Sequence, residues 1–158
     1  SKIAMEEIAN VYTTLYKLST VCLRNSNVYG SRQREDGIGP NCFASIKKSI
    51  KENGYIQITG DGEQTRDYVS VKDVVQANLL AMETEKVGKG EVINIGSAKQ
   101  YSVNAIPKLI GGAVKYIPPR IEPGRAEADI SKAKELLNWV PTIKLEDRII
   151  EFKKIFSV

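Results

Sequence analysis

Histidine is absent from the 158 residues of this sequence, and cysteine, methionine and tryptophan are rare, with two, two and one copies. Without histidine, a Ser-His-Asp triad, a His-ligated metal site and His acid–base catalysis are all excluded. No apolar run approaches the roughly 20 residues that a membrane-spanning helix needs, and no signal peptide precedes the first expected helix. We therefore expect no association with a membrane.

The two cysteines, Cys22 and Cys42, lie among apolar or helix-forming residues, with neither C-x-x-C nor another metal-ligand spacing. Two buried free thiols in a reducing compartment explain this usage best. We expect a cytoplasmic protein without a bound metal.

The charge is mildly positive, with 23 basic and 19 acidic residues and a net charge of +4. Lys47, Lys48 and Lys51 cluster on one expected helix, where a solvated face explains them, and no stacking aromatic residues are interleaved with them. We therefore expect no nucleic-acid partner. A small phosphorylated molecule suits this charge equally well.

Segments with the apolar spacing of helices alternate with short extended segments, which is the pattern of an α/β fold. Helices are expected at residues 2–18, 43–53, 75–82, 102–112, 130–137 and 145–156, with Pro107 interrupting the fourth. Strands are expected at residues 20–30, 55–62, 65–71, 90–96 and 114–120. Asp129 is suited to cap the fifth helix, and Asn138 can take the left-handed conformation that ends it. No repeat or linker divides the chain, so we expect one unit.

Four stretches carry most of the specific signal. They are LRNSNVYGSRQ at 23–33, GDGEQTRDYVSVKDVVQA at 60–77, NIG at 94–96 and PPRIEPGRAEADISKAKELLNWVP at 118–141. In this order and spacing they resemble the nucleotide-diphosphate-sugar epimerases of the UDP-glucose 4-epimerase type, within the extended short-chain dehydrogenase/reductase superfamily. The resemblance implies an NAD(P)-binding Rossmann-like fold with a small substrate-binding α/β domain, NAD as cofactor and a nucleotide-diphosphate sugar as ligand.

The opening SKIAMEE resembles the end of the family's Y-x-x-S-K signature, so Lys2 matches the catalytic lysine that also bonds the nicotinamide ribose. Seen alone, Lys2 is an exposed lysine at a helix start. The matching tyrosine would lie four residues earlier, and the Gly-rich dinucleotide fingerprint is also missing from the sequence. We therefore expect residues 1–158 to be the C-terminal portion of an epimerase, in which the last elements of the Rossmann sheet are interwoven with the substrate domain. Such a portion is expected to be inactive alone.

Two further residues match substrate positions of the family. Arg66 lies in QTRDY, where strand alternation points it away from its neighbours, and a guanidinium can grip a diphosphate through two parallel hydrogen bonds. Its alternative is a surface ion pair with Asp61 or Asp67. Asn27 offers an amide to the phosphate or the sugar, or else caps the loop before Gly30.

Weaker matches complete the expected site. Arg120 and Glu122 resemble the family's R-x-G-[DE], which clamps phosphate and ribose, although the following segment is about one residue short. Gln57 and Thr59 share one face of a strand where family members contact the nucleobase, or else form an exposed strand face. NVYGSRQ departs from the family at Ser31, where proline is usual. Asn25 and Ser26 replace the aromatic residues usual beside the nicotinamide.

The resemblance favours a 4-epimerase, with hydride removed from the sugar C4 and returned to the other face. Two alternatives stay open: a dehydratase, decarboxylase or reductase of nucleotide sugars, and a non-catalytic binding module. The first helix usually pairs with its copy in a second subunit of the family, so we expect a homodimer or larger assembly. Ile8, Val11 and Leu15 either serve that contact or face the core.

Overall fold

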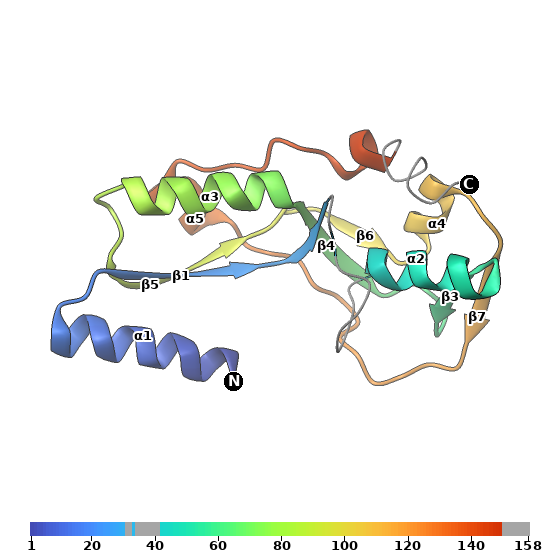
Figure 1. Ribbon diagram of the computed structural model, residues 1–158, viewed down its shortest axis with the longest axis horizontal. Coiled ribbons are helices and arrows are strands. Elements are labelled where there is room, and N and C mark those ends of the chain that lie inside the picture. The colour runs from blue at the N-terminus through green and yellow to red at the C-terminus, as the bar shows by residue number, and fades with distance from the viewer. Residues whose placement is uncertain (31–32, 34–41, 150–158) are drawn as a thin grey trace.

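The computed structural model describes residues 1–30, 33 and 42–149 (Figure 1). In chain order the elements are α1 (Lys2–Tyr16), β1 (Thr20–Asn25), β2 (Asn27–Tyr29), α2 (Cys42–Asn53), β3 (Ile56–Thr59), β4 (Thr65–Ser70), α3 (Val71–Glu83), β5 (Lys89–Ile95), β6 (Gln100–Ser102), α4 (Ala105–Ile110), β7 (Val114–Ile117) and α5 (Ser131–Leu137). A further helical stretch covers residues 145–149. Ser31, Phe152 and Phe156 lie outside the described residues.

The strands form three small sheets. β1 pairs with β5 and β3 pairs with β7, both in parallel, while β4 pairs in parallel with β2 and antiparallel with β6. Helix α1 lies on one side of the β1–β5 pair, and α3 and α5 lie on the other (Figure 1). Parallel strands with helices on both faces confirm the predicted α/β class.

Strand β4 joins two hydrophobic cores. Its Tyr68 belongs to a core built from α2, β3, β6 and α4, whereas the next residue, Val69, belongs to a core built from α3, β5 and α5. Successive strand residues point to opposite faces, so one strand supplies both cores. The site described below lies beside this junction.

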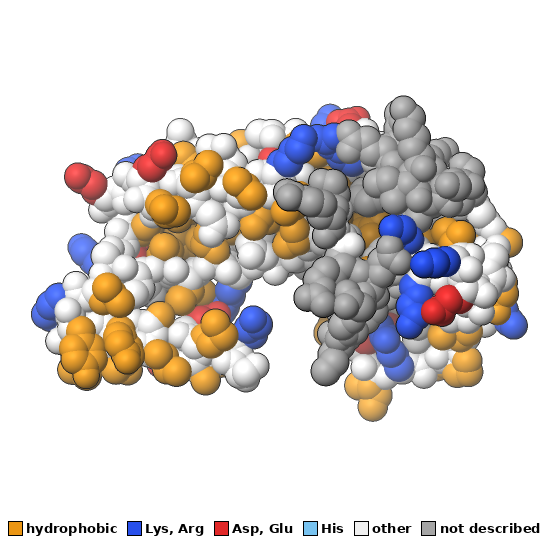
Figure 2. Space-filling view, in the orientation of Figure 1, with side chains coloured by type: hydrophobic (Ala, Val, Ile, Leu, Met, Phe, Trp, Pro, Cys, Tyr) orange, Lys and Arg blue, Asp and Glu red, His pale blue; other side chains and the backbone are white. Residues whose placement is uncertain are grey.

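The apolar stripe of α1 faces away from the chain. Ile8, Val11 and Leu15 are 57%, 47% and 67% exposed, and no residue of α1 is buried. The side toward β1 is polar or small instead: Thr20 Oγ1 donates to the Ala9 carbonyl, and Arg24 binds Glu6. Of the two readings of the stripe, the core-facing one is therefore wrong for this chain. Figure 2 shows these apolar side chains gathered along α1.

Two other helices differ from the expectation. Met82 is 82% exposed and its apolar companions on α3 are also exposed, because the small residues Ala77 and Ala81 form the face that meets the sheet. Pro107 does not interrupt α4; it is buried in the first turn, where a backbone N–H has no helical partner to lose. The short strand β6 was not predicted.

The ends of α5 and the Cys22 thiol agree more closely with the expectations from the sequence. The Asp129 carboxylate accepts the Ser131 N–H at 2.9 Å at the start of α5, and Asn138 ends that helix with a φ of 51°. Cys22 is a free thiol, half-buried rather than buried. Within residues 1–30, 33 and 42–149, no helix combines the length and apolar character needed to cross a bilayer.

Candidate functional site

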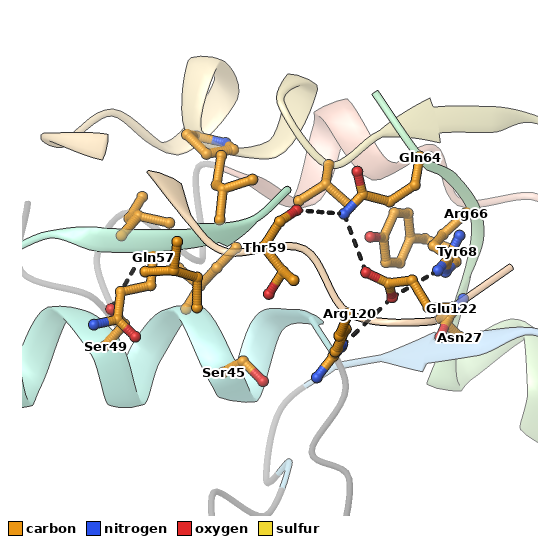
Figure 3. Close-up of a pocket in the computed structure, with 16 residues that line it drawn as sticks. Asn27, Ser45, Ser49, Gln57, Thr59, Gln64, Arg66, Tyr68, Arg120 and Glu122 are labelled. Carbon is orange, nitrogen blue, oxygen red and sulfur yellow. Dashed lines mark hydrogen bonds and ion pairs between the residues drawn. The ribbon is translucent and has the colours of Figure 1, made fainter. Parts of the chain in front are cut away.

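A pocket of about 390 Å³ opens between α2, β3, β4 and the segment after β7 (Figure 3). Its wall includes all six residues that the sequence nominated for the substrate: Asn27, Gln57, Thr59, Arg66, Arg120 and Glu122. These residues come from separate parts of the chain and meet only in the folded structure. The volume is within the range of small-molecule sites.

Arg66 is the most deeply held cation of the pocket, with a side chain only 15% exposed. Its Nη1 donates to the carbonyls of Thr65 and Pro123, each at 2.7 Å. Its Nη2 donates to Glu122 Oε2 at 2.9 Å, so the ion pair is with Glu122 rather than with Asp61 or Asp67. Within the described residues, no hydrogen bond is made by Nε, and Nη2 has one hydrogen beyond the bond to Glu122. The guanidinium therefore keeps donors for an anion besides its bonds to protein groups.

Glu122 lies between the two arginines. Arg120 Nη2 is 3.5 Å from the same Oε2 atom, and its side chain is 72% exposed. The other oxygen, Oε1, accepts a hydrogen bond from Gln64 Nε2 at 3.3 Å, and Gln64 also donates to the Thr59 carbonyl at 2.9 Å. The one-residue shortening of this segment therefore does not remove Arg120 and Glu122 from the site.

The opposite wall is built by β3 and α2. Gln57 and Thr59 alternate with the buried Ile56 and Ile58, and all four residues of β3 line the pocket. Ser49 of α2 fixes the start of this strand: its Oγ donates to the Tyr55 carbonyl at 2.7 Å and accepts the Gln57 N–H at 3.1 Å.

Asn27 connects this pocket to a second one of about 380 Å³. Its Nδ2 donates to the Asp67 carbonyl at 3.1 Å, so the amide is tied to β4 and does not cap the loop before Gly30. The second pocket lies at the carboxyl ends of the parallel strands β1 and β5, and Asn25, Ser26 and Asn94 line it. Ligands of α/β proteins bind at this end of a parallel sheet.

Lys2 is exposed and lines neither pocket. Because Ala9 contacts Thr20 at the start of β1 and Glu6 contacts Arg24 near its end, α1 runs antiparallel to β1. Lys2, one turn before Glu6, therefore lies at the carboxyl end of the strands, the same end as the second pocket. Two hydrogen bonds of 2.7 and 2.6 Å join Arg24 to Glu6, and they lower the pKa of the Glu6 carboxyl.

Sequence reasoning missed Ser45, Ser49 and Gln64 as pocket residues. Gln64 lies directly before β4 and two residues before Arg66, so it falls outside the alternating strand pattern. Among the described residues, no group of three or more Cys, Asp or Glu side chains is placed to hold a metal ion.

Comparison with known proteins gives the family. A family model described as the NAD dependent epimerase/dehydratase family matches residues 1–96. This chain belongs to that family. The predicted resemblance to nucleotide-sugar epimerases is thereby confirmed.

The most informative relative is a putative UDP-glucose 4-epimerase of Methanocaldococcus jannaschii, 40% identical over 94% of this chain and 49% of that protein. A UDP-N-acetyl-alpha-D-glucosaminuronate decarboxylase of Bacillus cytotoxicus is 28% identical over 93% of this chain and 49% of its own length. The chain thus spans about half the length of the curated relatives that it matches.

Solved structures of the family have the same fold. The UDP-glucose 4-epimerase of Thermotoga maritima with UDP-glucose superimposes with a TM-score of 0.86 at 36% identity, covering 98% of this chain and 51% of that one. The UDP-glucuronic acid 4-epimerase of Bacillus cereus, in complex with UDP-glucuronic acid and NAD, gives a TM-score of 0.82 at 34% identity, with 96% and 49% covered.

Only some features of this chain match a site for such a cofactor. The second pocket offers the polar side chains of Asn25, Ser26 and Asn94, and Lys2 lies at the same end of the strands. A Gly-rich phosphate-binding loop of the G-x-G-x-x-G kind does not occur in the sequence. The NAD diphosphate therefore has no matching loop in this sequence, and Asn25 and Ser26 stand where the family usually has aromatic residues beside the nicotinamide.

Proposed function

We propose that this chain forms the nucleotide-sugar-binding portion of an NAD-dependent nucleotide-sugar 4-epimerase of the UDP-glucose type. One observation carries the proposal: Arg66 and Arg120 converge on one point of a polar pocket that continues, through Asn27, to the carboxyl ends of two parallel strands. A diphosphate joins a nucleoside to a sugar, and two linked pockets with arginines beside their junction suit a ligand of that form.

Each pocket residue has a definite role in this proposal. The remaining donors of Arg66 and the exposed Arg120 bind the diphosphate, and Glu122 accepts a hydrogen bond from a ribose hydroxyl. Gln57 and Thr59, on the far wall, contact the nucleobase. Asn27 lies between the pockets and binds the phosphate or the sugar. Arg66 and Asn27 are already held by β4 and its neighbours, so little ordering is needed on binding.

NAD, when bound, supplies the hydride chemistry of a 4-epimerase. Lys2 would hold the nicotinamide ribose and lower the pKa of the tyrosine in the family's signature. Since the sequence has no Gly-rich fingerprint, we expect no turnover by the 158-residue chain alone. Epimerisation catalysed by the purified chain would contradict this expectation.

A second candidate keeps the binding site and changes the reaction. The likeness to a decarboxylase of a nucleotide sugar favours it, because the same half of the fold occurs with that chemistry. A product assay on a full-length enzyme that contains this chain distinguishes the two, since only an epimerase returns the sugar with one inverted centre.

Assembly and location belong to the same proposal. The exposed apolar stripe of α1 is suited to pair with a second copy as a homodimer, because an isolated helix face of this kind is unfavourable in water. A cytoplasmic location in carbohydrate metabolism suits the free Cys22 and the proposed ligand.

We further propose that the core around Val69 belongs to the nucleotide-binding sheet and the core around Tyr68 to the substrate domain.

The direct test is calorimetric titration of the chain with UDP-glucose and with dTDP-glucose. Arg66→Ala should abolish measurable binding, whereas Arg125→Ala, an exposed arginine on the same segment as Glu122, should leave binding unchanged. Circular dichroism of both variants establishes that they fold. Lack of binding by the folded wild-type chain would contradict the proposed site.

A further inference from the structure

Asp67 lies on the face of β4 opposite to Arg66 and is only 2% exposed. Its Oδ1 accepts the Ser97 N–H at 2.7 Å and lies 2.8 Å from Ser97 Oγ. Its Oδ2 accepts the N–H groups of Ala98 at 3.1 Å and Ala128 at 3.2 Å. The four donors therefore give both oxygens of this buried carboxylate hydrogen-bond partners.

The donors come from two segments that are distant in sequence. Residues 97–98 follow β5, and Ala128 ends the segment that carries Glu122. Ala98 has a φ of 52°, a left-handed conformation that is unfavourable for alanine. Such a conformation persists only when its surroundings hold it. The hydrogen bond to Asp67 is a direct restraint on that residue.

The same two segments touch at Gly96. A Cβ atom added there would lie 2.5 Å from Ala128 Cβ, 2.6 Å from Ser26 Oγ and 2.7 Å from Asp67 Oδ2. Residue 96 can lie this close to Ala128 and Ser26 only because it is a glycine. The Asp67 carboxylate packs against the same glycine from β4. Ser26, Asp67 and Ala128 all line the second pocket.

The backbone of this stretch of β4 ties the first pocket to the second. The Asp67 carbonyl accepts the Asn27 amide at 3.1 Å, and the Thr65 N–H donates to the Gly124 carbonyl at 2.9 Å. Together with Arg66, three consecutive residues therefore bind the segment 122–128 along its length. The distance between the two pockets is set by how closely this segment lies against β4.

We propose that Asp67 is a positioning residue that fixes the spacing of the nucleotide and sugar pockets by holding residues 97–98 and 128 against β4. This inference rests on the proposed function, since it assigns the sugar to the second pocket. Asp67 itself does not contact the reacting atoms in this proposal. Its carboxylate acts through residues 97–98 and through Ala128 of the segment that carries Glu122.

The test is Asp67→Asn, which keeps the size of the side chain but turns one acceptor into a donor facing an N–H group. UDP-glucose affinity should fall about tenfold, the size of a lost charge-assisted hydrogen bond, while UDP affinity should change less than about threefold. A residue that only stabilises the fold would not alter the ratio of the two affinities. Asp129→Asn is the matched control, because Asp129 is exposed and its carboxylate hydrogen-bonds only Ser131 among the described residues.

Amide hydrogen exchange gives a second readout. In Asp67→Asn, exchange at Ala98 and Ala128 should be faster, and exchange in the distant β3–β7 pair should be unchanged. An unaltered affinity ratio with a folded variant, or unaltered exchange at both alanines, would overturn the inference. If Asp67→Asn does not fold, Ser97→Ala is the second variant. It removes the hydroxyl contact with Asp67, together with the Ser97–Lys99 turn bonds, and keeps the carboxylate. It should shift the ratio in the same direction by about twofold, and an unchanged ratio in Ser97→Ala also overturns the inference.

The two proposals fail in different ways. If the folded wild-type chain binds neither UDP nor UDP-glucose, the proposed function is wrong. Faster exchange at Ala98 and Ala128 in Asp67→Asn would still support Asp67 as the residue that holds residues 97–98 and Ala128 against β4.

Discussion

The carboxylate of Glu122 binds Arg66 at 2.9 Å and lies 3.5 Å from Arg120, through the same oxygen atom. An acid thus lies between the two guanidinium groups that we propose bind the diphosphate. With Glu122 only 21% exposed, the attraction is screened less than at an open surface. Glu122 is therefore an internal counter-ion as well as a candidate ribose ligand.

Glu122→Gln removes the competing negative charge without changing the shape of the side chain. We expect the affinity for inorganic pyrophosphate to rise about threefold to tenfold, because the two arginines keep their positions and lose their internal partner. The measurement is calorimetric titration with pyrophosphate. A weaker affinity would show instead that the carboxylate is needed to hold the arginines in place.

Ile8→Glu with Leu15→Glu places two charges on the apolar stripe of α1. We expect the double variant to sediment as a monomer and the wild type as a dimer, since a charge is costly at a buried apolar interface. Met82→Glu, on the exposed side of α3, is the control and should leave the sedimentation coefficient unchanged. A monomeric wild type would contradict the proposed interface.

Acid should destabilise the chain through its paired carboxylates. Glu146 accepts hydrogen bonds from Lys99 Nζ at 2.6 Å and from the Tyr101 hydroxyl at 2.9 Å, and the bond from Lys99 contributes most to lowering the pKa of Glu146. A lowered pKa in the folded state means that the unfolded state binds the proton first. Stability present above the ordinary pKa of about 4.3 is therefore lost as the pH falls through the lower folded-state value.

In Glu146→Gln, the fall in melting temperature between about pH 6 and about pH 3 should be smaller than in the wild type, because this carboxylate no longer titrates. Glu52→Gln is the control: Glu52 is exposed and 3.9 Å from Lys48, so its removal should not alter the pH profile. Parallel profiles for wild type and Glu146→Gln would contradict the prediction.

Gly96→Ala should lower the free energy of unfolding by about 1–3 kcal/mol, since the added methyl group has no space between Ala128, Ser26 and Asp67. Gly124→Ala is the matched control. No atom lies within 4 Å of the Cβ position at Gly124, so the substitution should be neutral or stabilising by less than about 1 kcal/mol. Urea unfolding of both variants gives the comparison, and equal midpoints would contradict the packing at Gly96.

Local sequence patterns predicted which strand residues line the pocket better than they predicted which residues pair across it. Alternation along β3 and β4 placed Gln57, Thr59 and Arg66 on their faces, because the side-chain direction of a strand residue follows from its position alone. The partner of Arg66 could not be predicted this way. Glu122 is 56 residues away and reaches Arg66 only because the segment after β7 returns along β4.

The amphipathic helices show the same division. The sequence by itself determined that α1 and α3 each carry an apolar stripe and a polar or small-residue face. Only the tertiary structure decided which face meets the strands, since small side chains allow a helix to approach a sheet closely and the Glu6–Arg24 pair holds α1 by its polar side. The spacing of apolar residues predicts which face of a helix is apolar. It does not predict which neighbouring element covers that face, because the neighbour is determined by the tertiary fold. The α/β class and the family motifs could therefore be predicted from the sequence, and the linkage of two pockets through Asn27 and Asp67 could not.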